Sequence, residues 1–347
     1  TLNLGTSVNS INREDKTISL SDGTHQSYDK LVLATGARPI IPPIPGIETA
    51  NNLYPLRTTE DVTNIRNAFQ HSVNKIVVII GGGYIGLETA ASIKKLGGIV
   101  TVLERETRIL ARVTAPEMSD FFMKLHTENG VEVLTDKNVI SLDVQNGINT
   151  VNCADNSSFK ADIIIVGVGI RVNTELAKDA QLVIKNGVLV DETACTNDKD
   201  IYAIGDCAEQ HEAIGNRRPI EAVWYTGRMM GETLAQTICG NKTEYKPGHW
   251  FNSAKFLDIE YQTYGWVHGI KGRPENEMHF HWKHPKENIC ITIAFDKDTR
   301  KFLGINTFGI RMRHEYFDKV LTENQSVEKV LEHLSDANFD PEFYKLH

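Results

Sequence analysis

The first 33 residues of the chain alternate short β-like runs with polar turns. Residues 5–33 contain the runs TSVNSI, KTISL and KLVLAT, with the turn Ser21-Asp22-Gly23 before the last of them. This pattern predicts a β-hairpin that leads into a buried strand. Residues 38–46 then hold four prolines. Because proline is excluded from helix interiors and central strands, this segment is predicted to be a rigid connector.

The hydrophobic pattern changes period after the connector. Residues 59–69 suit a helix, and from Lys75 an apolar run (KIVVII) is followed by a glycine turn, a helical stretch at 84–96 and a second apolar run (IVTVLE). Strand, turn, helix and strand in this order predict a β-α-β unit. A helix-like segment ending at Gly130 and a β-rich stretch follow. Together they indicate one nucleotide-type domain over roughly 60–172.

The second half of the chain has two parts with different patterns. Residues 176–240 contain short β segments (GVLVD, IYAIGD) and a helical pattern near 223–238. From about residue 245 the chain is rich in aromatic strand-like runs (FLDIEYQTYGWV, MHFHWKH, ICITIAF, FLGINTFG), and a helical segment follows them. This change predicts a separate C-terminal α+β domain.

Composition and charge exclude several classes of protein. The 347 residues are too many for one ordinary core, and 41% of them are apolar without any run of 18 or more. A multidomain globular protein without a membrane span is therefore expected. The formal net charge of -8 lacks the basic excess that nucleic-acid binding requires. Five scattered cysteines form no CxxC pair, which favours a reducing cytoplasm over a disulfide framework or zinc site.

A GxGxxG motif stands at the turn of the β-α-β unit. Gly81 permits the tight turn, Gly83 lets a pyrophosphate approach the backbone, and Gly86 lets the helix lie close to the strand. The N-terminus of the helix offers free N–H groups and a partial positive charge to phosphates. Tyr84 and Ile85 belong to the same turn and join the candidate NAD-binding residues.

An acidic residue ends the second strand of the unit. Glu104 lies 18 residues beyond Gly86, where a ribose 2′-hydroxyl needs an acceptor, and it favours NAD over NADP. Arg105 follows directly and could accept a 2′-phosphate, so NADP stays open. The alternative is a glycine turn that serves only helix–strand packing beside a surface glutamate. Glu88, one turn into the helix, is by periodicity alone equally compatible with an exposed helix residue.

Further segments identify the chain as a member of a known family. It resembles the FAD-dependent pyridine nucleotide(-disulfide) oxidoreductases over essentially its full length, and is most similar to the ferredoxin and rubredoxin reductases. The matching segments are 28–39 (YDKLVLATGARP), 56–58 (LRT), 81–88 (GGGYIGLE), 112–117 (RVTAPE) and 201–207 (IYAIGDC).

The resemblance implies a set of FAD-binding residues. Thr35 and Gly36 would lie at a strand end of the FAD domain, and Arg57 would reach the flavin nucleotide. Gly205 and Asp206 would hold the ribityl or pyrophosphate region. An isolated ATG or GD pair is otherwise a simple strand-end turn, but their order on either side of a dinucleotide unit favours the family assignment.

The same resemblance assigns residues near the two reacting rings. Trp224 and the nearby Glu221 fall where the family contacts the isoalloxazine, although a core or interface tryptophan is the alternative. Glu88 becomes a candidate catalytic residue near the nicotinamide, and Gly169 lies in a turn that would face NAD. The hydride would pass from nicotinamide to flavin without a covalent bond to any side chain.

The fold class that follows is α/β, with Rossmann-like FAD/NAD(P)-binding domains in the glutathione-reductase-like two-dinucleotide-binding arrangement plus a C-terminal α+β domain. The family's own FAD-type GxGxxG precedes the first residue of this chain, so the FAD domain is expected to be incomplete and FAD binding uncertain. The predicted domains are 1–57 (partial FAD domain), 58–175 (inserted NAD domain), 176–244 (return of the FAD domain) and 245–347 (C-terminal interface domain).

The expected function is an FAD-dependent NADH oxidoreductase of the cytoplasm. It would pass hydride from NADH to flavin and then electrons to a ferredoxin- or rubredoxin-like protein, with no nucleic-acid or membrane partner, and a homodimer is a candidate assembly. One alternative is an NADH oxidase, peroxidase or CoA-disulfide reductase whose redox cysteine lies upstream of this chain. Another is a non-enzymatic flavoprotein that signals or dimerises when NADH binds.

Two side-chain clusters in the C-terminal part are given less weight. His279 and His281 alternate along one predicted strand, but no acidic residue or cysteine completes an obvious metal site, so no metal is expected. Arg311, Arg313 and His314 could form a small basic patch for an acidic ferredoxin, but a plain surface cluster is the favoured interpretation.

Overall fold

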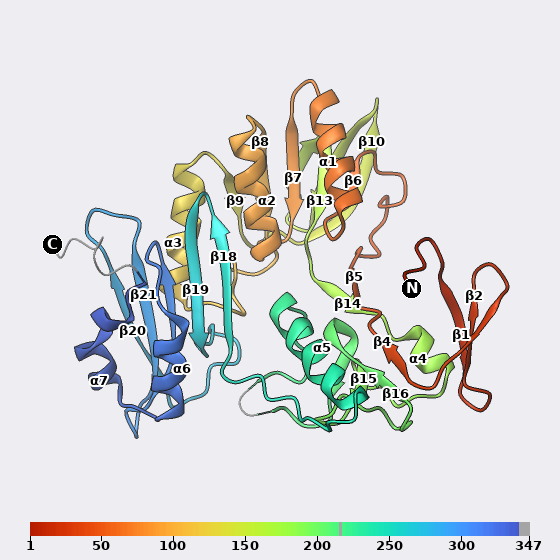
Figure 1. The fold of residues 1–347 in the computed structure, drawn as a ribbon. Helices are drawn as coiled ribbons and strands as arrows, with labels where there is room; N and C mark the ends of the chain where they lie inside the picture. Colours follow the sequence, from red (N-terminus) through yellow and green to blue (C-terminus); the bar gives the residue numbers. More distant parts are fainter. Residues whose placement is uncertain (215–216, 340–347) are drawn as a thin grey trace. The chain divides into compact units, whose positions relative to one another are not determined.

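The computed structural model describes residues 1–214 and 217–339, and the chain divides into two compact units (Figure 1). The first unit comprises residues 1–38 and 170–248, and the second comprises residues 39–169 and 249–347. Each unit is therefore built from two separate stretches of sequence. The divisions between the units fall at residues 38/39, 169/170 and 248/249, so the proline-rich connector belongs to the second unit.

The first unit combines small sheets with one long helix. An antiparallel hairpin sheet (β1–β2–β3) leads into β4, which pairs in parallel with β16, while β15 pairs in parallel with β17. Apolar side chains from these strands and from α5 form one core. The elements are β1 (Val8–Asn12), β2 (Thr17–Leu20), β3 (His25–Ser27), β4 (Leu31–Leu33), β5 (Ala37–Pro39), β14 (Ile170–Val172), α4 (Glu175–Asp179), β15 (Val188–Val190), β16 (Ile201–Ala203), η1 (Gly205–Cys207), β17 (Ala208–Gln210) and α5 (Trp224–Ile238).

The first half of the second unit contains a five-stranded parallel sheet. The strand order is β6-β13-β7-β8-β9, so β7 is central and α2 connects it to β8. Strand β7 reads IVVII and is almost wholly buried, as expected for a parallel strand covered on both faces. The elements are β6 (Leu53–Pro55), α1 (Thr59–His71), β7 (Ile76–Ile80), α2 (Tyr84–Lys95), β8 (Ile99–Leu103), α3 (Pro116–Glu128), β9 (Glu132–Leu134), β10 (Val139–Gln145), β11 (Ile148–Cys153), β12 (Ser158–Ala161) and β13 (Ile163–Val166).

The second half of this unit is a five-stranded antiparallel sheet with the order β18-β19-β22-β21-β20. Helices α6 and α7 pack on one of its faces through a core around Phe302 and Phe317. The predicted aromatic runs account for four of the strands, in which successive side chains point to opposite faces of the sheet. The elements are β18 (Phe251–Phe256), β19 (Ile259–Gly265), β20 (Glu277–Lys283), β21 (Cys290–Asp296), β22 (Phe302–Phe308), α6 (His314–Thr322), α7 (Val327–Glu332) and η2 (Leu334–Ala337).

A shared aromatic core joins the nucleotide-type half to the antiparallel sheet. Phe122 of α3 is fully buried and makes edge-to-face contacts with Phe256 (4.8 Å between ring centroids) and Phe308 (5.0 Å). Leu87 of α2 lies in the same cluster. Such aromatic pairs stabilise beyond their buried area. The helix that carries the glycine motif is therefore held on two sides, by its own parallel sheet and by the C-terminal sheet.

A buried histidine makes the stability of the second unit pH-dependent. His126 is fully buried, and its Nδ1 lies 2.8 Å from the carbonyl oxygen of Phe122. Burial lowers the pKa of His126 below 6.5 although its two backbone carbonyl neighbours act in the opposite direction. The folded chain therefore holds this ring neutral where the unfolded chain binds a proton.

The contribution of His126 to the free energy of unfolding should consequently be fully present above pH 6.5. It should be lost as the pH falls below this value. The loss is up to about 1.4 kcal/mol per pH unit until the folded-state pKa is reached. Thermal unfolding between pH 7 and 5 measures the slope. A His126→Gln variant should flatten it, whereas His25→Gln at an exposed position should not. An equal slope in all three proteins would refute this assignment.

Candidate functional site

The glycine motif lies where the sequence placed it, at the carboxyl end of β7 and the start of α2. Gly81 has φ +113°, a conformation that residues with a side chain rarely adopt. A Cβ on Gly81 would lie 2.4 Å from the carbonyl oxygen of Gly167, and a Cβ on Gly86 would lie 2.0 Å from the carbonyl oxygen of Gly81. Two of the three glycines are therefore required by packing around the turn.

The middle glycine meets a different demand. Gly83 is the N-cap of α2, with ordinary extended φ and ψ and no side-chain cap hydrogen bond. A Cβ built on Gly83 would meet no atom within 4 Å. Packing therefore does not explain a glycine at this position. An open space over the N-terminus of a 12-residue helix is the place where a pyrophosphate can approach free backbone N–H groups.

Glu104 is fixed against this turn by two backbone hydrogen bonds. Its Oε2 accepts from the N–H of Gly82 (2.7 Å) and its Oε1 accepts from the N–H of Glu106 (2.8 Å). The carboxylate thus lies beside the glycine turn and is only partly exposed, which is the position of a ribose acceptor. The neighbouring Arg105 side chain is 66% exposed and lies 3.6 Å from Glu106.

The turn after β13 lies beside the glycine motif. Gly167 donates its N–H to the carbonyl oxygen of Ile80 (2.8 Å), so β13 ends next to β7. Gly169 has φ +119°, and its carbonyl oxygen accepts from the N–H of Ile40 (3.0 Å). The structure therefore brings Gly81, Gly83, Gly86, Glu104 and the turn of Gly169 to one edge of the parallel sheet.

Two of the remaining candidates on α2, Glu88 and Tyr84, contact the C-terminal sheet. The Oε1 of Glu88 accepts a hydrogen bond from the N–H of Lys255 (2.9 Å). The ring of Tyr84 stacks on Phe256 with 6.2 Å between centroids, while Ile85 is 48% exposed. A role of Glu88 near the nicotinamide stays a prediction. No sequence pattern marks the bond to Lys255, which lies 167 residues further along the chain.

A second set of candidates meets in the first unit, at the carboxyl ends of β4 and β16. These strands are paired in parallel, Leu31 opposite Ile201. Thr35 and Gly36 follow the first strand, and Gly205 and Asp206 follow the second. Since the carboxyl ends of adjacent parallel strands lie at one edge, this is where ligands bind in open α/β sheets. Gly205 has φ +71°, so the chain turns sharply there.

A residue missed by the sequence reasoning holds this edge together. The Oγ1 of Thr35 donates to the carbonyl oxygen of Asn173 (2.8 Å), and the Nδ2 of Asn173 donates to the carbonyl oxygen of Thr35 (2.8 Å). The N–H of Asn173 also donates to the carbonyl oxygen of Gly36 (2.9 Å). Thr35 and Asn173 are 138 residues apart, and no local pattern marks Asn173.

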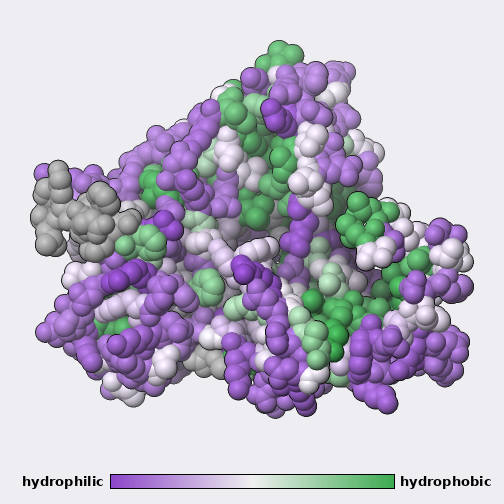
Figure 2. All heavy atoms as spheres, viewed as in Figure 1, coloured by the Kyte–Doolittle hydropathy of each residue, from purple (hydrophilic) through white to green (hydrophobic). Residues whose placement is uncertain are grey.

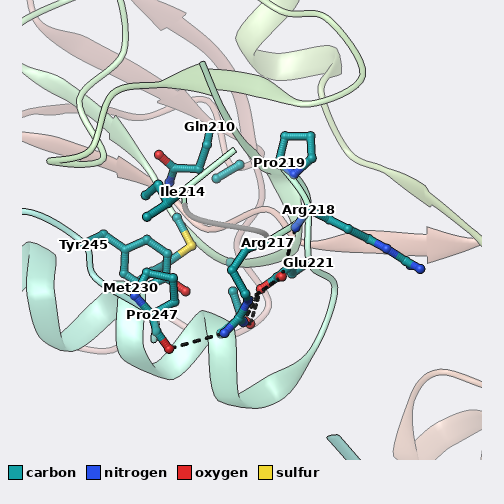
Figure 3. Close-up of a pocket in the computed structure, with 12 residues that line it drawn as sticks. Gln210, Ile214, Arg217, Arg218, Pro219, Glu221, Met230, Tyr245 and Pro247 are labelled. Atoms are coloured by element: carbon teal, nitrogen blue, oxygen red, sulfur yellow. Dashed lines mark hydrogen bonds and ion pairs between the residues drawn. The ribbon is translucent and has the colours of Figure 1, made fainter. Parts of the chain in front are cut away.

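Glu221 is part of a buried ion pair in the wall of a small pocket (Figure 3). Arg217 donates from Nε to Oε1 of Glu221 (2.6 Å) and from its Nη2 to Oε2, while Thr226 donates to the same Oε2 (3.1 Å). Gln210 also lines the cavity, and its Nε2 has no partner among the residues that the structure describes. Both carboxylate oxygens of Glu221 are thus already paired within the chain.

The last two flavin candidates lie in different units. Trp224 begins α5, is 70% exposed and has the guanidinium of Arg228 5.7 Å from its ring centroid. Arg57 belongs to the second unit, where its N–H donates to Asp61 (2.9 Å) just before α1. An exposed tryptophan at a helix start leaves its ring available for stacking on a ligand.

The histidines of β20 and the basic residues near Arg311, which the sequence offered as a metal site and a basic patch, have partners within the second unit. His279 Nε2 lies 2.7 Å from Oε1 of the buried Glu277, whose Oε2 lies 2.6 Å from His268 Nδ1. Burial by itself would raise the pKa of Glu277, but these hydrogen bonds lower it to about 2. Over residues 1–214 and 217–339 there is no group of three or more His, Cys, Asp or Glu that could hold a metal ion. Arg311 lies 3.7 Å from Glu260.

No helix in the described part of the chain is both long enough and apolar enough to cross a membrane. Hydrophilic side chains cover most of the face shown in Figure 2, and hydrophobic ones gather in smaller groups.

Two glycine-bearing edges of parallel strands, one in each unit, define the class: a protein built on two dinucleotide-binding folds with a C-terminal antiparallel sheet. The family model described as pyridine nucleotide-disulphide oxidoreductase matches residues 1–231, and the chain belongs to this family. The fold class and the family expected from the sequence are thereby confirmed.

Individual relatives are similar over most of the chain. Putidaredoxin reductase of Pseudomonas putida is 39% identical over 258 residues, which cover 73% of this chain and 60% of the relative. Rubredoxin-NAD(+) reductase of Ectopseudomonas oleovorans is 35% identical, covering 70% of this chain and 63% of the relative. The chain thus spans about three fifths of the length of these relatives.

Solved structures agree with these relatives. The crystal structure of a covalent putidaredoxin reductase–putidaredoxin complex superposes with a TM-score of 0.82 at 31% identity, covering 94% of this chain and 77% of that chain. A ferredoxin reductase from Rhodopseudomonas palustris gives a TM-score of 0.83 at 25% identity, covering 97% of this chain and 80% of that chain. The structural similarity therefore extends over the C-terminal sheet, which lies beyond the residues 1–231 that the family model matches.

Proposed function

We propose that this chain provides the NADH site and part of the FAD site of an NADH-dependent flavoprotein reductase that delivers electrons to a small iron–sulfur or rubredoxin-type protein. The observation that carries the proposal is the open space at Gly83, over the N-terminus of α2 and beside the fixed carboxylate of Glu104. A dinucleotide needs both a phosphate-binding turn and a ribose acceptor, and these two residues supply them.

The residues present also fit a flavin. Gly36 has φ +66° and would meet no atom within 4 Å if it carried a Cβ, so the backbone there can be approached closely. Thr35, Gly36, Gly205 and Asp206 would hold FAD at the edge formed by β4 and β16, and the exposed Trp224 would lie against its ring system. Bound FAD would supply the hydride acceptor for NADH and release electrons one at a time to the partner.

The chain's own residues then bind, orient and exclude water. The helix N-terminus at Gly83 would hold the pyrophosphate of NADH, and Glu104 would accept a hydrogen bond from its ribose. Glu88, fixed by the N–H of Lys255, would border the nicotinamide end. Asn173 keeps the Thr35–Gly36 turn in its conformation. The printed names of the relatives, putidaredoxin reductase and rubredoxin-NAD(+) reductase, support the proposed class of acceptor.

The test is an anaerobic absorbance experiment. The protein is reconstituted with FAD, titrated with NADH and then supplied with a ferredoxin or rubredoxin as electron acceptor. We expect flavin absorbance to bleach rapidly and turnover to follow. Slow bleaching without turnover would contradict the reductase and favour an NADH-responsive flavoprotein. Failure of NADH to bind, measured separately by calorimetry, would refute the nucleotide site itself.

Glu104 should set the preference for NADH over NADPH. A Glu104→Ala variant removes the ribose acceptor and is expected to weaken NADH binding about 10- to 150-fold, since a hydrogen bond to a charged group contributes roughly 1.5–3 kcal/mol. NADPH binding should weaken less, because its 2′-phosphate no longer faces a carboxylate. Calorimetry with both nucleotides measures the ratio. Glu128→Ala, at an exposed site on α3, is the control, and an unchanged ratio in Glu104→Ala would contradict the assignment.

A further inference from the structure

The chain contains three Asn-Gly pairs, which begin at Asn129, Asn146 and Asn186, and one Asp-Gly pair, which begins at Asp22. In such pairs the backbone nitrogen of the glycine can attack the side-chain carbonyl carbon before it, because glycine has no side chain to hinder the approach. The attack requires that the side-chain group and the glycine N–H leave their hydrogen bonds and that the backbone between them rotate. The structure separates the four pairs by these conditions.

The pair at Asn186 is held by a buried carboxylate. Glu209 is 1% exposed, and its Oε2 accepts from the N–H groups of Asn186 (2.7 Å) and Gly187 (2.8 Å). Its Oε1 accepts from the Nδ2 of Asn186 (3.3 Å). One side chain thus binds both the nitrogen that would attack and the amide that would leave. Rotation at this pair would leave a buried carboxylate without its donors, which is costly.

The pair at Asn129 is held by the end of helix α3. Asn129 is the C-cap of this helix, and its Nδ2 donates to the carbonyl oxygen of Leu125 (2.8 Å). The N–H of Gly130 donates to the carbonyl oxygen of Thr127 (2.9 Å). Both bonds satisfy carbonyl groups that the helix end leaves without a partner. Attack at this pair therefore requires the last turn of α3 to unwind.

The pair at Asp22 is protected by its charge. The Oδ1 of Asp22 accepts from the N–H of Thr24 (2.9 Å) and from its hydroxyl group (2.7 Å). These hydrogen bonds lower the pKa of Asp22 below its usual value, so the side chain stays a carboxylate. A carboxylate is a poor target for a backbone nitrogen, because its negative charge repels the attacking electron pair.

The pair at Asn146 meets none of these restraints. Asn146 and Gly147 form the tip between β10 and β11, where Gln145 pairs with Ile148. Their φ angles are +53° and +79°, as in a type I′ turn, and both residues are exposed. The side-chain amide of Asn146 and the N–H of Gly147 have no hydrogen-bond partner in the part of the chain that the structure describes. This tip can therefore open by fraying of the hairpin end alone.

We propose that Asn146 is the site at which this protein deamidates spontaneously. The nitrogen of Gly147 loses its proton to base and attacks Cγ of Asn146. The N–Cγ bond forms, the Cγ–Nδ2 bond breaks, and the amide nitrogen leaves as ammonia with a proton from water. The cyclic imide then adds a water molecule at either of its carbonyl carbons, which yields aspartate or isoaspartate. The reaction needs no oxidant, and it is independent of NADH and flavin.

The isoaspartate product would disturb more than the turn. In isoaspartate the main chain runs through the side-chain carbon and is longer by an atom, so the two-residue turn cannot keep Gln145 opposite Ile148. The next residue, Asn149, is fully buried, and its side chain bonds the N–H (2.8 Å) and the carbonyl oxygen (2.7 Å) of Asn51. Asn51 lies just before β6. We therefore expect the modification to loosen β11 and its attachment to the edge of the parallel sheet.

The first experiment compares the three asparagines in one sample. The protein is kept at mildly alkaline pH in water enriched in oxygen-18, and peptide mass spectrometry measures uptake of the label. We expect Asn146 to react at least about tenfold faster than Asn129 and Asn186, since those two must first open held structure. In denaturant the three should react at similar rates, because each is then a flexible Asn-Gly pair. The denatured sample thus separates the effect of the fold from that of the sequence.

The second experiment removes the site without straining the turn. Asn146→Gly keeps a residue that tolerates positive φ and should abolish most of the isoaspartate that an isoaspartyl methyltransferase labels in the folded protein. Asn156→Gly is the matched control, because Asn156 is also exposed with positive φ (+66°) but precedes a serine. It should leave the labelling unchanged. Circular dichroism checks that both variants fold.

Three results would overturn the proposal. These are equally slow reaction at all three Asn-Gly pairs of the folded protein, faster reaction at another asparagine, and unchanged labelling in Asn146→Gly. Selective uptake of oxygen-18 at Asn146 in the folded protein, together with loss of labelling in Asn146→Gly alone, would support it.

Discussion

Replacing Gly83 with valine is expected to abolish NADH binding while leaving the fold intact. A Cβ at this position meets no atom within 4 Å, and the backbone conformation is an ordinary extended one. The new side chain would occupy the space over the N-terminus of α2 that the pyrophosphate needs. A loss of affinity of at least about 100-fold, or about 2.7 kcal/mol, should be measured by calorimetry.

Two comparisons make this result specific. Ser92→Val places the same side chain on an exposed position of α2, away from the glycine turn, and should bind NADH normally. Gly86→Ala, in contrast, should destabilise the protein as well, because its Cβ would lie 2.0 Å from the carbonyl oxygen of Gly81. Normal NADH affinity in Gly83→Val would refute the proposed nucleotide site.

Breaking the buried ion pair of the first unit should have the largest effect on stability. Arg217 and Glu221 are 7% and 9% exposed, and Arg217 binds both carboxylate oxygens. Arg217→Met leaves a buried carboxylate without its countercharge, at a cost of about 3–5 kcal/mol. Hydrogen exchange of α5 is the suitable measurement, since the two units need not unfold together.

Helix α5 offers a control with the same sequence spacing. Arg228 and Glu232 have the same i, i+4 spacing but side chains that are 61% and 63% exposed, so Arg228→Met should cost no more than about 1 kcal/mol. The double variant Arg217→Met/Glu221→Leu should recover part of the loss, because no unpaired charge stays buried. Equal protection of α5 in Arg217→Met and Arg228→Met would contradict the role assigned to the pair.

Much of the fold could be predicted because its signals are local. The apolar run before Gly81, the spacing of the glycines and Glu104 at the end of the next strand lie within 30 residues, and each follows from backbone geometry at one turn. The expected helix at 59–69 appears as Thr59–His71 and that at 84–96 as Tyr84–Lys95. Periodicity identified these elements because one face of each is buried.

The domain organisation was harder to derive from the sequence. The predicted segment 1–57 contains β6 (Leu53–Pro55), which the structure pairs with β13 in the parallel sheet of the second unit. The C-terminal sheet shares a core with α3 around Phe122. It therefore belongs to the same unit as the parallel sheet. Strands that pair, or elements that share a core, across a long stretch of sequence leave no periodic pattern in that sequence. Which two elements meet depends on tertiary packing and not on the residues next to each of them in the chain.

By itself the sequence determined the β-α-β unit, the glycine turn with Glu104 and the family, since these depend on residue types at fixed short spacings. Only the tertiary structure decided that Glu88 accepts from Lys255, that Asn173 fixes the Thr35 turn, and that β20 is an edge strand of the C-terminal sheet. The physical reason is the same in each case. A hydrogen bond or a sheet edge is defined by which backbone lies beside it, and that neighbour comes from a distant part of the chain.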